Sequence, residues 1–258
     1  MEILDPDLSL FWPIFTVMAG PAAGSFIGLA SLRLPAGQSL LTPASTCGGC
    51  GARLGVADLI PLISYAVWRG RCRRCGARIP ARYPLIELAC LGIGIWAASI
   101  EIGALVFITA LLGWTLLLLA ILDAEHFWLP RVLTWPLLIL GLLVSATLGV
   151  DDLVEGLVGA AAGFALFAGL NLVYRRLRGR DGLGGGDWRL LAAGGAWVGW
   201  TGLPSILLWA ALGGVAAVLV KAAATRRLRA DDRVPFGVFL AGGVWLTWLY
   251  GPLGAGFV

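Results

Sequence analysis

Charged residues are scarce in this sequence of 258 residues. Asp, Glu, Lys and Arg make up 13% of it, about half their share in soluble domains, whereas 59% of the residues are hydrophobic. The mean hydropathy of +0.88 excludes an ordinary soluble domain and indicates a polytopic membrane protein. A pI near 9.0 would suggest a nucleic-acid partner for a soluble protein. Here we expect the lipid bilayer as a partner and no nucleic acid, because membrane proteins concentrate basic residues on one side.

Several common signatures are also missing. The first apolar stretch follows Glu2, Asp5 and Asp7 rather than a basic segment, so we expect no ordinary cleaved signal peptide. The chain contains neither the G-x-S-x-G motif of a serine nucleophile elbow nor the P-loop of nucleotide-binding enzymes. His126 is the only histidine, and a lone histidine at a membrane boundary is more often structural than catalytic.

The sequence is dominated by long apolar runs. A membrane-spanning helix needs about 20 predominantly apolar residues. We therefore predict an all-α polytopic membrane protein with about eight transmembrane helices and a small cytoplasmic zinc-binding domain between the first and second. The expected spans are residues 9–30, 84–100, 102–122, 132–149, 153–174, 187–202, 204–224 and 235–253.

The basic residues predict the orientation of these spans. With eight spans, all 19 Lys and Arg residues fall on one side of the membrane, which the positive-inside rule identifies as the cytoplasm. Both termini are then outside the cytoplasm. The expected domains are a first span (1–32), a cytoplasmic four-cysteine domain (33–83) and a seven-span membrane domain (84–258). The opposite side receives acids only: Glu2, Asp5, Asp7, Glu101, Asp151, Asp152 and Glu155.

Two C-x-x-C pairs lie in the cytoplasmic domain, in "CGGCGAR" (47–53) and "CRRCGAR" (72–78). A glycine that tolerates a tight turn follows each pair, and the 21 residues between Cys50 and Cys72 approach the usual gap of a four-cysteine zinc site. Cytoplasmic thiols stay reduced, so structural disulfides are disfavoured. A redox dithiol pair and cysteines without a function are the alternatives, and Cys90 is interpreted as a buried structural cysteine. The predicted ligands of a structural zinc ion are Cys47, Cys50, Cys72 and Cys75.

Two aspartates mark the cytoplasmic membrane boundary. Asp123 follows the 21 uncharged residues 102–122, in "LDAEHFWLPRVLT", and the alternative to a functional role is contact with headgroups or with Arg131. Asp187 follows a glycine-rich stretch that cannot form a stable helix, and irregular backbone at membrane depth is tolerated only beside protein or a water-filled cavity. The alternative for Asp187 is a flexible loop and an ordinary helix N-cap.

The topology brings these aspartates to one depth although 64 positions separate them in the sequence. Two carboxylates in one site would form an aspartic dyad, which shares one proton because adjacent anions repel. Such a dyad activates water and polarises a carbonyl, so it cleaves peptides without a metal or a covalent nucleophile. The roles of Glu87 and Glu125 stay open between structural and functional. Glycines that could let a substrate backbone approach are Gly184, Gly185 and Gly186.

These motifs, in this order, resemble those of the type IV prepilin peptidases, bifunctional leader peptidase and N-methyltransferase enzymes of the bacterial inner membrane. In this sequence, "GSFIGLASLRLP" is similar to the family's first-span motif, and residues 47–89 are similar to its cysteine-rich domain. The stretch "VPFGVFLAGG" is similar to its last-span motif. The two aspartate motifs are similar to "LDAEHFWLPRVLTWPLLILGLL" and to "GRDGLGGGDWRLLAAGGAWVGW", with the G-x-G-D signature at Gly184 to Asp187. Gly28 and Arg189 depart from the asparagine and lysine that are usual in the family.

The resemblance implies an aspartic endopeptidase that cuts the basic leader from prepilins and pseudopilins at the cytoplasmic boundary. It assigns the catalytic roles to Asp123 and Asp187 and implies that the enzyme N-methylates the new N-terminus, with S-adenosylmethionine as methyl donor. Because no glycine fingerprint for that donor is visible, its site is not assigned. The competing hypotheses are a proton-coupled transporter, which would favour internal repeats and midplane charges that are not seen, and a zinc-dependent membrane scaffold.

Overall fold

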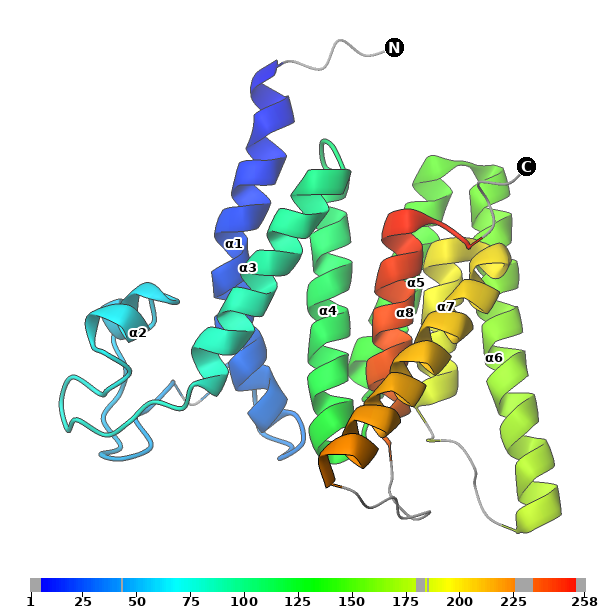
Figure 1. Cartoon of the computed structure of the whole chain (residues 1–258). Helices are drawn as coiled ribbons and strands as arrows, with labels where there is room; N and C mark the ends of the chain where they lie inside the picture. Colours follow the sequence, from blue (N-terminus) through cyan, green and yellow to red (C-terminus); the bar gives the residue numbers. More distant parts are fainter. Residues whose placement is uncertain (1–5, 43, 180–183, 185, 226–233, 254–258) are drawn as a thin grey trace. The chain divides into compact units, whose positions relative to one another are not determined.

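The structure is a computed structural model that describes residues 6–42, 44–179, 184, 186–225 and 234–253 (Figure 1). Its regular elements in these ranges are helices only, which confirms the predicted all-α class. They are α1 (Pro6–Arg33), the 3-10 helix η1 (Val56–Asp58), α2 (Ile63–Val67), α3 (Arg82–Ile100), α4 (Leu105–His126), α5 (Arg131–Leu148), α6 (Val150–Arg178), α7 (Asp187–Thr225) and α8 (Phe236–Tyr250).

Six of the described helices are long and apolar enough to cross a membrane, namely α1, α3, α4, α5, α6 and α7. Helix α8 is also apolar but has only 15 residues. Together these helices cover all eight predicted spans, because α7 contains both the sixth and the seventh. Its 39 residues include Gly199, whose backbone is not helical (φ 71°, ψ 177°).

Helix α7 turns back on itself at Gly199. In a straight helix the 12 residues from position 194 to position 206 would span about 18 Å. Instead, a Cβ atom built on Gly194 would lie 3.0 Å from Cδ1 of Ile206. Figure 1 shows the second half of α7, in orange, returning to the end where the first half begins. The sixth and seventh predicted spans therefore form a helical hairpin.

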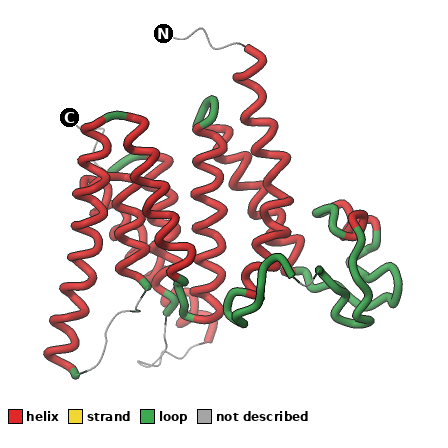
Figure 2. Tube along the Cα trace, turned by 180° about the vertical axis from the view of Figure 1, so that it is seen from behind, coloured by secondary structure: helices red, strands yellow, loops and turns green. Residues whose placement is uncertain are grey.

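The chain forms two compact units, residues 1–114 and 115–258. In the first unit, α1 and α3 approach closely where side chains are small. A Cβ on Gly20 would lie 2.9 Å from the carbonyl oxygen of Cys90, and one on Gly94 would lie 3.2 Å from that of Thr16. Small residues at helix contacts are typical of membrane proteins, because they let backbones meet. Between α1 and α3 the chain is mostly loop (Figure 2).

The second unit packs α5, α6, both halves of α7, and α8 around a core whose largest fully buried side chains include Leu190, Leu191 and Ile206. Glycines again set the spacing, since a Cβ on Gly163 would lie 2.8 Å from the carbonyl oxygen of Leu191. A Cβ on Gly243 would lie 2.5 Å from the carbonyl oxygen of Ile206. This tight packing holds α7 against both α6 and α8.

Candidate active site and metal centre

Asp123 lies on the last turn of α4 and is 5% exposed. Its Oδ2 atom accepts the backbone N–H of Val238 at 3.2 Å, and the backbone of Gly237 is also hydrogen-bonded to the carboxylate. Both belong to the first turn of α8, whose N–H groups have no partner inside the helix. The start of α8 thus holds the Asp123 carboxylate in place. Asp123 makes no ion pair with Arg131 among the described residues, unlike the alternative drawn from the sequence.

Gly237 is the residue that lets α8 approach this carboxylate. A Cβ built on Gly237 would lie 2.8 Å from Oδ2 of Asp123 and 3.0 Å from Cδ1 of Leu129. The first separation is shorter than real Cβ contacts show, and the second is tighter than most of them. Any larger residue at position 237 must therefore displace Asp123 or Leu129.

Asp187 is the first residue of α7 and is 6% exposed. Its N–H donates to the carbonyl oxygen of Gly184 at 3.2 Å, and the backbone of Gly184 is hydrogen-bonded to its carboxylate. The carboxylate of Asp123 is close enough to that of Asp187 for the two to interact electrostatically, and both belong to the second unit. The structure therefore brings together the two aspartates that the sequence predicted to meet.

Leu129 lies between the two segments that hold the aspartates. A Cβ on Gly186, just before Asp187, would lie 2.5 Å from Cβ of Leu129, and the side chain of Leu129 also reaches Gly237. Gly186 is buried and Gly184 is exposed, whereas Gly185 lies outside the described residues. The irregular backbone predicted before Asp187 is present at Gly184 and Gly186, which precede the helix.

Arg189 is a further polar residue at this site, and no role was predicted for it from the sequence. It is 9% exposed, and its Nη2 atom donates to the carbonyl oxygen of Leu129 at 3.1 Å. Its guanidinium group lies 4.8 Å from the centroid of a ring of Trp188 and interacts electrostatically with Asp187. Arg189 thus links the loop after α4 to the first turn of α7. The signals in the sequence were its place two residues after the G-x-G-D signature and its departure from the lysine that is usual in the family.

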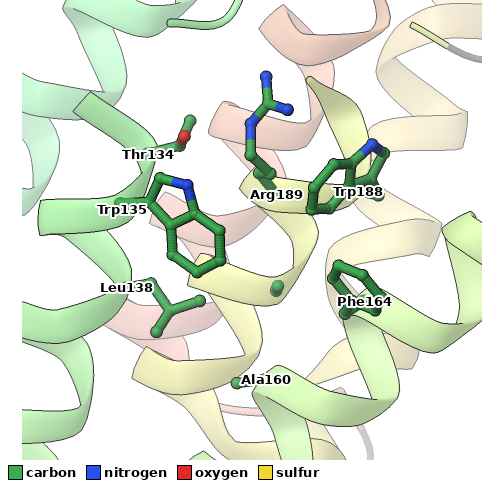
Figure 3. Close-up of a pocket in the computed structure, with 8 residues that line it drawn as sticks. Thr134, Trp135, Leu138, Ala160, Phe164, Trp188 and Arg189 are labelled. Carbon is green, nitrogen blue, oxygen red and sulfur yellow. The ribbon is translucent and has the colours of Figure 1, made fainter. Parts of the chain in front are cut away.

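A small hollow of about 140 Å³ adjoins Arg189 between α5, α6 and α7. Figure 3 shows Trp135 on one side of it and Trp188 and Phe164 on the other, with Arg189 and Thr134 at one end. Its lining is mainly aromatic and aliphatic, so it suits an apolar group. Neither Asp123 nor Asp187 lines it.

The other acidic candidates differ from the aspartate pair in their surroundings. Glu125 and His126 are both exposed, and their side chains approach to 3.9 Å. Glu87 belongs to the first unit and is 6% exposed, with its Oε2 atom accepting the backbone N–H of Leu62 at 2.8 Å. Its partners are this N–H and the hydroxyl of Ser25. Glu87 therefore joins α3 to the loop segment that carries the cysteines.

The four cysteines of the first unit form a cluster that could hold a metal ion. The Sγ atoms of Cys47, Cys50, Cys72 and Cys75 all lie within 4.8 Å of one another. The Sγ atoms of Cys47 and Cys75 are 3.8 Å apart. Sulfur atoms bound tetrahedrally to zinc at about 2.3 Å are separated by about 3.8 Å, so the spacing fits that ion. Cys90 is fully buried on α3, away from this set, as predicted.

Both C-x-x-C pairs adopt the same local structure. In each, the N–H of the first cysteine donates to the carbonyl oxygen of an alanine five residues later, at 2.9 Å for Cys47 and 2.8 Å for Cys72. The glycine after each pair has a left-handed backbone, with φ 68° at Gly51 and 71° at Gly76. That conformation is readily available only to glycine, which explains its place in both motifs.

The backbone of the first knuckle also favours a thiolate. Backbone N–H groups of Cys50 and Gly49 lower the pKa of Cys47 to about 6. A hydrogen bond from the Ala77 backbone lowers the pKa of Cys75. The neighbouring thiol of Cys50, burial and the other two thiols outweigh this effect and raise the pKa to about 11. The backbone around Cys47 thus already stabilises a thiolate. A bound cation would stabilise the thiolate forms of the other cysteines.

Two protein-family models match this chain. The model of the bacterial peptidase A24 N-terminal domain matches residues 18–100, and that of the type IV leader peptidase family matches residues 110–219. No solved structure gives a significant match.

Relatives named prepilin leader peptidase/N-methyltransferase cover most of the chain. One from Burkholderia pseudomallei (strain K96243) is 41% identical over 220 residues, which are 84% of this chain and 71% of that protein. One from Pseudomonas aeruginosa PAO1 is 32% identical over 282 residues, covering 97% and 95% of the two chains. A third, from Klebsiella pneumoniae, is 39% identical over 206 residues, which are 77% of this chain and 90% of that protein. With two buried aspartates that interact electrostatically in the matched region, the chain belongs to the type IV leader peptidase family of membrane aspartic proteases.

Proposed function

We propose that this protein cleaves the basic leader peptide of type IV prepilins and pseudopilins and then N-methylates the new N-terminus, with Asp123 and Asp187 as the catalytic pair. The observation that carries the proposal is that two buried aspartates, 64 positions apart in the sequence, interact within one unit. The relatives bear the names of both activities, and the family membership extends over both halves of the chain.

The proposed chemistry is that of an aspartic dyad. One carboxylate, ionised, takes a proton from a water molecule, while the other, protonated, polarises the scissile carbonyl. The N–H of Val238 orients Asp123, and the backbone of Gly184 does the same for Asp187. Groups held in this way lose little freedom when the substrate binds, which favours catalysis by positioning.

The expected substrate matches the place of the pair. A prepilin has one apolar helix preceded by a basic leader, so its scissile bond lies at the membrane boundary. Asp123 ends α4 and Asp187 begins α7, and both helices are of membrane-spanning length. Gly184, which is exposed, has no side chain to obstruct an extended peptide beside Asp187, whereas Gly186 is buried against Leu129. The positive-inside distribution supports a cytoplasmic location for this boundary and for the cysteine domain, in a bacterial inner membrane.

The four cysteines would hold a structural zinc ion. The donor set is all thiolate and complete, which is typical of structural rather than catalytic zinc sites. Their knuckles belong to the first unit and both aspartates to the second, so we assign the ion to folding of the cysteine domain. S-adenosylmethionine is the proposed methyl donor.

Cleavage of a prepilin by the purified protein in detergent is the decisive test. The wild-type protein should shorten the prepilin at the end of its leader, and with S-adenosylmethionine the product should gain one methyl group by mass spectrometry. A protein that binds the prepilin but never shortens it would support the scaffold hypothesis. Proton-coupled transport without cleavage would support the transporter hypothesis.

A further inference from the structure

The loop domain between α1 and α3 contains an apolar segment that is unusual for a chain surrounded by water. Residues 59–68, "LIPLISYAVW", carry no charged side chain and include the helix α2. A water-soluble domain rarely exposes large apolar side chains together, because such a patch usually binds a partner or a membrane. In and just before this segment, the exposed large apolar side chains are Val56, Leu59, Ile60, Ile63, Val67 and Trp68.

Three of these side chains follow the spacing of one helix face. Ile63 and Val67, four residues apart on α2, are each 61% exposed. The chain already turns helically at Ile60, whose carbonyl oxygen accepts the N–H of Ser64 at 3.0 Å. Trp68 follows directly after α2, and tryptophan is enriched at the interface between membrane and water. The segment therefore presents an apolar face that ends on an aromatic side chain suited to a membrane surface.

A hydrogen bond holds this segment at the level of the membrane boundary. The backbone N–H of Leu62 donates to Oε2 of Glu87 at 2.8 Å. The 19 residues of α3 extend about 28 Å, close to the hydrocarbon thickness of about 30 Å, and Glu87 lies about 7 Å along the helix from its first residue, Arg82. Figures 1 and 2 both show α2 at the level of the lower parts of α1 and α3 rather than below their ends. Interfacial helices bury their apolar face to a similar depth, about 5–10 Å.

Basic residues follow the apolar segment immediately. Arg69, Arg71 and Arg74 are exposed, and the guanidinium group of Arg73 lies 5.8 Å from the centroid of the Trp68 ring. Positive charges beside an apolar face are complementary to a leaflet that contains anionic lipids. The same charges would repel the basic leader of a prepilin, so a lipid surface suits this face better than the substrate does.

We infer that residues 59–68 form an interfacial anchor, which inserts its apolar side chains into the leaflet at the Arg82 end of α3 and places the following arginines among anionic headgroups. Binding of such an element grows with its buried apolar area and with its attraction to anionic lipids, and this segment offers both. Cys72 lies four residues after Trp68, so the anchor holds the second cysteine knuckle against the membrane surface. This inference stands independently of the proposed peptidase activity.

Depth-dependent fluorescence quenching tests the anchor in the full-length protein. The fluorescent amino acid acridonylalanine replaces Val67, and the protein is placed in lipid nanodiscs whose lipids carry a nitroxide near the start of the acyl chain. The matched control carries the same fluorophore at Arg53, an exposed position in the first cysteine knuckle. Lipid nitroxides should quench the emission at position 67 at least about threefold more than at position 53, and water-soluble iodide should show the opposite preference.

Lipid charge and one substitution test the two parts of the inference. Phosphatidylglycerol in place of part of the phosphatidylcholine should increase the lipid quenching at position 67, and added salt should remove this increase. Ile63→Asp alters an exposed side chain and should reduce that quenching at least about twofold, with an unchanged circular dichroism spectrum. Equal lipid quenching at positions 67 and 53, or no effect of phosphatidylglycerol, overturns the inference. Protection from iodide without lipid quenching also overturns it and assigns this face to a protein partner, such as a second copy of the chain.

Discussion

At the scale of single residues, the environment of each carboxylate distinguishes the two proposed catalytic acids from the others. Asp123 and Asp187 are 5% and 6% exposed, and each is hydrogen-bonded by backbone. Glu125 and His126, only two and three positions after Asp123, are exposed. Burial beside a second carboxylate is therefore the property that distinguishes the proposed pair, since perturbed ionisable groups concentrate at functional sites.

Replacing either aspartate with asparagine should abolish prepilin cleavage. Asparagine keeps the size of the side chain but cannot exchange a proton with water, so single-turnover cleavage should slow by at least about 10³-fold. The double variant should be no slower than either single variant, because residues that act as one unit are not additive. Glu125→Gln is the matched control and should retain substantial activity. Robust cutting by Asp123→Asn or Asp187→Asn would remove that residue from the mechanism.

At the scale of elements, the start of α8 places one of the two carboxylates. Gly237→Ala would put a methyl group 2.8 Å from Oδ2 of Asp123, and the backbone of α8 is fixed against α7. We expect cleavage to fall on the order of 10²-fold, since a displacement of about 1 Å can cost that much. Gly242→Ala, on the same helix, meets nothing within 4 Å and should cleave at the wild-type rate. Equal rates for the two variants would contradict the role given to Gly237.

The two cysteine knuckles form a separate element with its own test. The purified protein should contain about one zinc ion per chain, because four thiolates complete a tetrahedral site. Cys50→Ser should lose the metal and destabilise the loop domain, whereas Cys90→Ser should keep it, since Cys90 is buried on α3. Metal analysis of both variants, with methylation and cleavage assayed in parallel, checks this. Methylation should suffer more than cleavage. Wild-type protein that carries no zinc after preparation without chelators would refute the assignment.

Sequence patterns predicted local features of the site better than its long-range contacts. Gly51 and Gly76 could be placed in the knuckles because a turn after C-x-x-C is a local property of the chain. The meeting of Asp123 with Asp187 followed from topology alone. The hydrogen bond from Val238 to Asp123 joins residues 115 positions apart, and no periodicity of one sequence specifies such a contact. Leu129 and Arg189 were missed for the same reason, since their roles depend on which loops meet.

At the scale of the whole molecule, the arginine distribution predicts which loops face the cytoplasm. Reporter fusions after Arg78 should be cytoplasmic and fusions after Gly103 and Asp152 periplasmic, because basic residues cluster only in alternate loops. The activity of a paired cytoplasmic and periplasmic reporter measures this. A periplasmic signal from the cysteine loop would invert the orientation and would leave the proposed zinc site on the oxidising side.

Helix α7 offers the sharpest test of the eight-span topology. Its 39 residues, if straight, would extend about 58 Å, nearly twice the hydrocarbon thickness of about 30 Å. The contact between Gly194 and Ile206 indicates that α7 turns back at Gly199 and crosses the membrane twice. A fusion after Thr201 should then be periplasmic and a fusion after Arg229 cytoplasmic. The same location for both fusions would mean that the chain does not cross the membrane between these positions. If both were periplasmic, the last arginine cluster would lie on the side assigned to the acids.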